Sequence, residues 1–512
     1  MERFLSKIRV AAIVAVLLIA GAGLAVQMFG NHAMFRTYGL DLGIYTKALY
    51  DYSHLRFNDC TFYLWEPSNL LADHFDIQLF LLSPLSRVAD DGVLLAVQLI
   101  AVLFGALGMG FVGRQRGAGA VVQIVAVALP LVTFGTWHAT SFDYHSNVLS
   151  AMLLPWLLYS VEKARRRLLT RGRVRGRSDR RVWPWWSATI VLILILIGKE
   201  SSALWAAAVL LALMWDYRRD KAVLRWLIFS MLGCLAYFAA VTLLVMPSLG
   251  GSSRGFWRYD WMGGSFGEVA GWIVTHPLQA VRDLFVDFTP AADKGYLKTE
   301  FLICLMLSGG AFCVLKPNYL LMLIPPMALK MLAADSVSFW GISNHYNVEM
   351  CMVACAATVV VLTAGRRRGQ SEQPWRRIVA VIALVLTFST LIYTVNHPRT
   401  FIRQANVNII KPVHYQQTEF GADEAHRMIR MIPKDASVCA TTMFTPHLAS
   451  RDSVYIFPMG LAHNVEYYLL LRSHWSYYEG EEEEVARLIA DTAGYETLAS
   501  DGQLFLLRKR GK

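Results

Sequence analysis

Asp41 is a lone carboxylate between Gly39 and Gly43, within a patterned stretch over residues 34–51. The apolar residues of this stretch recur at the spacing that lines one face of a short helix, and its polar residues argue against a place in lipid. We therefore expect a membrane-surface helix that presents an acid to a cavity. Such a carboxylate can remove a proton from a hydroxyl group as a general base. It could instead cap the helix, a position that aspartate favours.

Further polar residues stand at the predicted outer ends of apolar runs. They are His74, Asp143, His145, Lys199, Glu200, Arg254, Arg258 and His345. Charges are costly in a bilayer, so a dense set near one surface needs a reason. Lys199 could bind a phosphate while Glu200 orients it, or the two could form only a local ion pair. Each histidine could be a hydrogen-bonded structural residue.

Metal and thiol chemistry find little support in the sequence. Two Asp/His pairs, within 73–74 and 143–145, could chelate a divalent cation, but no recognised ligand spacing is present. We therefore predict no metal site and no cofactor. Five of the seven cysteines lie in apolar runs, whereas Cys60 and Cys439 lie in predicted outer segments and could pair.

The composition defines the class of protein. The chain has 512 residues, of which 55% are apolar and 17% are charged, with a mean hydropathy of +0.39. Apolar runs near the ~20 residues needed to cross a bilayer recur along most of it. These features indicate an α-helical polytopic membrane protein. The net charge of +11 comes mainly from basic residues in short loops, which orient a membrane protein, so we expect no nucleic-acid partner.

The basic residues place the N-terminus in the cytoplasm and predict about eleven spans in a transmembrane domain over 1–395. The expected spans cover 10–29, 93–112, 118–135, 148–159, 185–198, 202–215, 224–246, 300–315, 319–333, 348–364 and 378–395. The first outer loop, 31–76, carries the amphipathic helix. A second outer loop, 247–299, is rich in aromatic and basic residues and has an amphipathic piece over 266–288.

From residue 396 onward the composition becomes that of a small soluble domain, which this topology places outside the membrane. We expect helices over 422–431 and 481–492 and strands over 437–440, 454–457 and 467–471. A terminal hairpin over 495–507, turning at Asp501-Gly502, completes an extracytoplasmic α/β domain over 396–512.

The motifs YGLDLGIYTKAL, ADHFDIQLFLLSPL, SFDYHSN and GKES, with the tail IPKDASVCATTMFTPHLASRDSVYIFP, carry a resemblance. Together they resemble a bacterial family of polytopic membrane proteins called domain of unknown function twenty seventy-nine. Members typically read DLGI, HF, FDFH and KE at these places. Tyr144 and Ser201 depart conservatively from that pattern. The resemblance covers nearly the whole chain.

The architecture also resembles the GT-C glycosyltransferase superfamily, which implies inverting transfer of a sugar from a polyprenyl-phosphate donor to an envelope acceptor. This resemblance places the protein in the bacterial cell membrane with chemistry on the outer face. Asp41 would be catalytic, although several GT-C enzymes have paired acids there. Lys199, Glu200, Arg254, Arg258 and His345 would bind the donor phosphate or sugar, with His74, Asp143 and His145 supporting the cavity. The implied partners are the lipid-linked donor and membrane lipid, and the sequence identifies no protein partner.

Two other functions remain open. A transporter or flippase of a lipid-linked envelope precursor would have discontinuous helices in symmetric halves and polar residues at mid-bilayer. We find no such repeat, and the polar residues gather at one face. A non-catalytic envelope scaffold would bind a partner through its outer domain, and it would tolerate replacement of Asp41 or Lys199.

Overall fold

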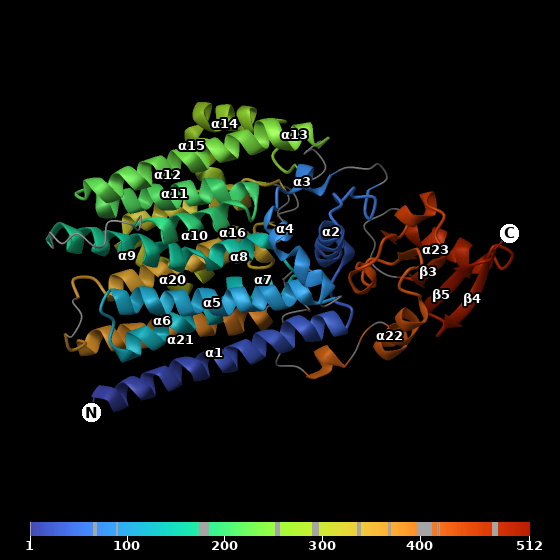
Figure 1. Ribbon diagram of the computed structural model, residues 1–512, viewed down its shortest axis with the longest axis horizontal. Coiled ribbons are helices and arrows are strands. Elements are labelled where there is room, and N and C mark those ends of the chain that lie inside the picture. Colours follow the sequence, from blue (N-terminus) through green and yellow to red (C-terminus); the bar gives the residue numbers. More distant parts are fainter. Residues whose placement is uncertain are drawn as a thin grey trace. The chain divides into compact units, whose positions relative to one another are not determined.

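The computed structural model describes residues 2–64, 69–88, 91–173, 184–250, 257–288, 296–334, 339–366, 370–396, 412–416, 418, 420–473 and 480–511 (Figure 1). The chain forms two compact units. The first contains residues 1–24, 98–245 and 253–408 and is helical, whereas the second contains 25–97, 246–252 and 409–512 and includes a β-sheet. Segment 31–76 therefore belongs to the same unit as the C-terminal domain.

Seven of the described helices are long and apolar enough to cross a membrane. They cover Lys7–Ala33, Val93–Gln115, Ala120–Ser141, Lys221–Ser248, Leu297–Leu315, His345–Leu362 and Pro374–Asn396. Each overlaps a predicted span. The other four predicted spans correspond to α9 (Leu154–Arg173) with the end of α8 (Ser146–Met152), α10 (Trp186–Leu196), α11 (Glu200–Tyr217) and α18 (Leu320–Met331). The total of about eleven spans stays a prediction.

Helix α20 (Val348–Leu362) forms the core of the helical unit, and almost all of its residues are buried. It packs against α6 (Ala120–Val132), α7 (Phe134–Ser141), α8, α17 (Ala311–Leu315) and α18. Gly135 allows α7 to approach closely, because a Cβ there would lie 2.7 Å from Cys351 Sγ and 2.9 Å from Asn347 O. The start of α20 is therefore held against α7.

The remaining helices complete this unit. Helix α5 (Val93–Gln115) precedes α6, and α12 (Lys221–Ala240) lies alongside α11 (Figure 1). The predicted amphipathic piece forms two short helices, α14 (Phe266–Thr275) and α15 (Pro277–Asp283). Helix α16 (Leu297–Leu305) is joined to α17 through η6 (Met306–Gly310), where the chain kinks at Ser308 and Gly309, and α21 (Pro374–Asn396) follows later in the chain.

The C-terminal domain in the second unit has a five-stranded sheet in the order β2-β1-β3-β5-β4. Strands β1 (Val438–Ala440), β2 (Val454–Ile456) and β3 (Tyr467–Leu471) are parallel, while β5 (Leu504–Lys509) is antiparallel to β3 and β4 (Tyr495–Ser500). The helices are α22 (Ala422–Met431) and α23 (Glu481–Ala490), and α23 packs on the sheet core (Figure 1). These elements confirm the predicted helices, strands and hairpin. Cys60 and Cys439 are both buried free thiols, so they do not pair.

Segment 31–76 contacts the C-terminal domain within the second unit through the backbone of Gly39. The chain leaves α1 (Glu2–Ala33) and enters a π-helical turn, η1 (Gly39–Gly43), that runs directly into α2 (Ile44–Ser53). Gly39 N donates to Thr442 O at 2.8 Å. A Cβ at Gly39 would lie 2.5 Å from both Ile456 Cδ1 and Thr445 Oγ1. Only glycine fits this contact.

Replacing Gly39 by alanine should therefore destabilise the second unit. We expect a loss of ~1–3 kcal/mol in the free energy of unfolding, because the added methyl group must displace packed atoms. Thermal unfolding of the purified protein in detergent measures this loss. Gly267→Ala is the matched control, since a Cβ on this α14 residue meets no atom within 4 Å; an equal effect of the two changes would contradict the packing argument.

His414 joins the C-terminal domain to the end of α1 within the second unit. Its Nε2 lies 2.9 Å from Asn31 Oδ1 and donates to it, while Arg36 donates to the His414 carbonyl. The side chain is buried. Burial, and then the nearby Arg36 charge, lower the pKa of His414 from 6.5 to about 4. The folded chain therefore favours the neutral imidazole.

This shift predicts an acid-sensitive contribution to stability. With the folded pKa below the unfolded one, the contribution is complete above pH ~6.5 and declines as the pH falls toward ~4, by at most ~3 kcal/mol. Thermal unfolding at pH 7.5 and 5.0 should show a larger loss for wild type than for His414→Asn, whose amide does not titrate. Equal losses would refute the assignment to His414.

Candidate functional site

A glutamine on α5 fixes the loop between α7 and α8. Gln98 Nε2 donates to Asp143 O at 2.8 Å, and Gln98 Oε1 accepts from His145 N at 2.9 Å. Asp143 has a φ of 64°, a left-handed conformation that aspartate tolerates better than most residues. All three side chains are buried. The loop is therefore held in one strained conformation by a residue that sequence reasoning missed.

Two of the predicted histidines meet beside this loop. The rings of His145 and His345 stack with centroids 3.6 Å apart and an interplanar angle of 18°. Phe142 covers them at 5.4 Å from His145 and 5.8 Å from His345. Asn344, with a φ of 62°, turns the chain immediately before His345. Two loops with left-handed residues thus present a buried histidine pair.

An amide and a carboxylate extend this histidine pair. Asn147 Nδ2 donates to Glu349 Oε1 at 2.9 Å and to His345 O at 3.3 Å. Lys199 lies close enough to Glu349 to interact with it electrostatically. We call His145, Asn147, Lys199, His345 and Glu349 the polar cluster. It combines hydrogen-bond donors, a cation and an acid at the starts of α8, α11 and α20.

Sequence reasoning missed Asn147 and Glu349 in this cluster. Glu349 is the single carboxylate in the predicted span 348–364. An ionisable residue within a span often marks a functional site, so this feature could have identified Glu349 from the sequence. Lys199 occupies the N-cap position of α11 in an extended conformation, and Glu200 begins that helix, where the helix dipole favours an acid. The chain therefore passes from α10 to α11 through residues 197–199 alone.

The predicted arginines belong to the segment before α14. Arg254 lies outside the described residues. Arg258 is half-buried, its Nη1 donates to Trp257 O at 3.2 Å, and its own carbonyl accepts from Ala334 N at 2.7 Å. The adjacent Tyr259 hydroxyl donates to Leu329 O at 2.6 Å. These bonds fix the arginine-bearing segment against the end of α18.

Asp41 and His74 lie in the second unit. Asp41 is half-buried inside η1, and Tyr38 occupies the N-cap position, so Asp41 is not the residue that caps the helix. π-Helical turns of this kind recur at functional sites. His74 ends α3 (Leu70–Asp73), two residues before the fully buried Asp76. Burial, and then the charge of Asp76, raise the pKa of Tyr52 on α2, which places Asp76 near that helix.

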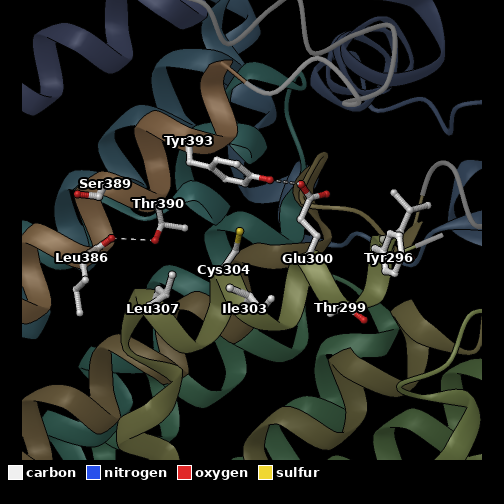
Figure 2. Close-up of a pocket in the computed structure, with 11 residues that line it drawn as sticks. Tyr296, Thr299, Glu300, Ile303, Cys304, Leu307, Leu386, Ser389, Thr390 and Tyr393 are labelled. Carbon is white, nitrogen blue, oxygen red and sulfur yellow. Dashed lines mark hydrogen bonds between the residues drawn. The ribbon is translucent and has the colours of Figure 1, made fainter. Parts of the chain in front are cut away.

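An apolar groove runs between α16 and α21 in the helical unit (Figure 2). Its volume is about 600 Å³, and its walls include Ile303, Leu307 and Leu386. At one end Tyr393 points toward Glu300, and its hydroxyl donates to Glu300 Oε1 at 2.8 Å. The groove therefore offers an extended apolar surface that ends at a polar pair.

The fold defines an α-helical polytopic membrane protein that carries a small α/β domain, and its helical unit contains the polar cluster, in which Lys199 and Glu349 are half-buried. The chain belongs to the family described as predicted membrane protein (DUF2079), which matches residues 31–172 and 181–502. This finding confirms the family expected from the motifs. No curated protein matches the sequence.

Solved structures resemble the chain over most of its length. ArnT from Cupriavidus metallidurans, bound to undecaprenyl phosphate, is 11% identical, with 97% of each chain covered and a TM-score of 0.49. The Archaeoglobus fulgidus oligosaccharyltransferase tethered with an acceptor peptide is 13% identical, covering 98% of this chain and 74% of that one, with a TM-score of 0.46. The lipid and the peptide belong to those structures, and the function of this chain has to be argued from its own residues.

Replacing Gln98 by leucine should loosen the loop that carries Asp143 and His145. The change leaves the Asp143 carbonyl and the His145 N–H buried without their partner, which should cost ~2 kcal/mol or more in the free energy of unfolding. Thermal unfolding in detergent measures it. Gln503→Leu is the control, because the Gln503 side chain is exposed; if both variants unfold together, Gln98 does not hold the loop.

Proposed function

We propose that this protein is a membrane glycosyltransferase that moves a sugar from a polyprenyl-phosphate donor to an envelope acceptor. The observation that carries the proposal is the polar cluster. Polar and charged groups of this kind are expensive in a membrane protein and mark sites of function. In the proposed topology the N-terminus is cytoplasmic, and the cluster and the C-terminal domain face outward from a bacterial cell membrane.

The proposed reaction is a direct displacement at the anomeric carbon of the donor sugar. The acceptor hydroxyl forms the new carbon–oxygen bond while the bond from that carbon to the phosphate oxygen breaks, so the configuration inverts. Polyprenyl phosphate leaves with the electron pair, and a carboxylate takes the hydroxyl proton. We assign the proton to Asp41, the acid that the sequence resemblance favours.

The leaving phosphate needs positive charge and hydrogen-bond donors where its own charge develops. Lys199 supplies a cation. Two acids would orient it: Glu349, which interacts with it electrostatically, and Glu200, which follows it in the sequence. His345 and His145 supply ring nitrogens for the phosphate or the sugar. Arg254 and Arg258 are assigned to the same phosphate, with His74 and Asp143 in supporting roles.

The groove between α16 and α21 suits the prenyl tail of such a donor. Its walls are mainly apolar, which favours burial of isoprene units by the hydrophobic effect. Glu300 would repel a phosphate, so we assign the groove to the tail and not to the head group. An apolar tail lying there would remain in contact with lipid.

A transporter for a lipid-linked envelope precursor is the second candidate, and a non-catalytic envelope scaffold is the third. A transporter would need polar residues near the middle of interrupted helices. The polar cluster instead lies in loops and first turns at helix starts. This position favours an enzyme that works at one membrane surface.

Asp41→Asn should abolish transfer while leaving the protein inserted and folded. Loss of a general base lowers the rate by at least ~100-fold, whereas the amide keeps the shape of the side chain. The measurement is a profile of envelope glycans and polyprenyl-phosphate sugars in a deletion strain. One glycan should vanish and its lipid-phosphate sugar should accumulate.

Complementation decides among the candidates. Wild type and Asp59→Asn, which changes an exposed acid of the same outer segment, should restore the profile, and Asp41→Asn should not. Restoration by Asp41→Asn would remove the catalytic role of that residue. A deletion that changes no glycan would favour the transporter or the scaffold. Loss of folded Asp41→Asn protein would mean that Asp41 is structural.

A further inference from the structure

Three ligand-forming side chains meet within the second unit. His32 ends α1, Asp91 lies just before α5, and His447 lies in the short helix η11 (Thr445–Leu448) of the C-terminal domain. Among the described residues, this is the one group of three whose ligand atoms all lie within 4.8 Å of one another. None of the three has a role in the proposed transfer reaction.

The two histidine rings share one carboxylate oxygen. His32 Nε2 lies 3.3 Å from Asp91 Oδ2, and His447 Nδ1 lies 3.1 Å from the same atom. Both histidine side chains are nearly buried, at 9% and 4% exposure, whereas the Asp91 side chain is 47% exposed. The group is therefore enclosed on the histidine side and open on the carboxylate side, which gives a path for an ion.

The hydrogen bonds behind the rings determine which nitrogens face Asp91. His447 Nε2 lies 3.1 Å from the carbonyl oxygen of His32, which can only accept, so this nitrogen carries a hydrogen. The other nitrogen of a neutral His447 ring then turns its lone pair toward the carboxylate. Two electron-rich atoms at 3.1 Å need a positive charge between them. His32 Nδ1 is likewise engaged behind the ring, 2.9 Å from Thr37 Oγ1.

We propose that His32, Asp91 and His447 bind one divalent transition-metal ion of the zinc class. Two imidazole nitrogens and a carboxylate oxygen are ligands that Zn²⁺ takes, at about 2.0–2.2 Å. Around a tetrahedral ion such ligands stand roughly 3.3 Å apart, close to the observed 3.3 and 3.1 Å. The hydrogen bonds to Thr37 Oγ1 and to the His32 carbonyl would fix the orientation of the two rings, as the outer ring nitrogens of metal-bound histidines commonly do.

Binding requires a small rearrangement of the rings. The His32 and His447 rings stack with centroids 3.9 Å apart and an interplanar angle of 14°, so their lone pairs lie in two nearly parallel planes. One ring must turn about its Cβ–Cγ bond for both lone pairs to converge on an ion. The competing arrangement keeps the stack and places a second proton on one ring, which forms an ion pair with Asp91 and binds no metal.

The ion would crosslink three segments of the second unit that are far apart in sequence. It would bind the end of α1, the turn at Asp91 and Gly92, and the C-terminal domain. Gly92, with a φ of 71°, fixes that turn. Phe35 packs against His447 with ring centroids 4.6 Å apart. Bound metal should therefore act as a structural clip for this unit.

The test is zinc binding by the full-length protein, purified in detergent with a tag that lacks histidine. After dialysis against micromolar Zn²⁺ and removal of free ion, metal analysis should find about one Zn²⁺ per chain. Zn²⁺ should raise the thermal midpoint by ~3 °C or more, and a chelator should reverse the gain. Mg²⁺ should do neither, because imidazole is a poor ligand for it.

Variants separate the metal clip from the competing ion pair. Asp91→Asn, at the most exposed ligand, and His447→Gln should each lose the bound zinc and the zinc-dependent rise. His54→Ala, which removes an exposed histidine of the same unit, should keep both. If wild type binds no more zinc than Asp91→Asn, the proposal is overturned and the rings share a proton. If His447→Gln fails to fold, the comparison with Asp91→Asn still decides.

Discussion

The second unit depends on a backbone contact that allows no side chain. Gly39 donates its N–H to Thr442 O in the C-terminal domain, and the atoms of Ile456 and Thr445 occupy the space that a Cβ would need. This contact fixes the first turn of the helix that carries Asp41. The position of the candidate base is thus determined by residues of a domain near the other end of the chain, which explains why a loop so polar adopts one conformation.

In the helical unit, buried polar groups must find hydrogen-bond partners within the protein, and this requirement fixes the loops of the polar cluster. The Gln98 side chain donates to the Asp143 carbonyl and accepts from the His145 N–H. The Asn147 side chain donates to Glu349 and to the His345 carbonyl. Unsatisfied polar groups in an apolar environment cost several kcal/mol each, so these bonds are what permit charged groups at helix starts. The left-handed residues at 143 and 344 are sustained by the same network.

Much of the fold could be predicted from the sequence, and much of the site could not. Hydropathy located the long spans because lipid exposure requires continuous apolar runs, and the short apolar run YYLLL at 467–471 located β3 to the residue. His145 and His345 were singled out by type, but their stacking depends on the tertiary approach of two loops. Gln98 was passed over because it is one neutral polar residue in an apolar run, and nothing local reports its partner. Glu349 could have been singled out as a lone carboxylate in an apolar span, but its contact with Asn147 depends on the tertiary fold.

The contact between Gly39 and Thr442 joins two parts of the chain that are synthesised at different times. Gly39 precedes Thr442 by 403 residues, and ribosomes add about 5–20 residues per second, so the partner is made roughly 20–80 s later. The domain itself is completed only by β5, because this last strand lies between β3 and β4. Segment 31–76 therefore remains without its binding surface until the residues around Thr442 are made, and a nascent chain that stalls before β5 leaves this segment accessible to proteases and chaperones.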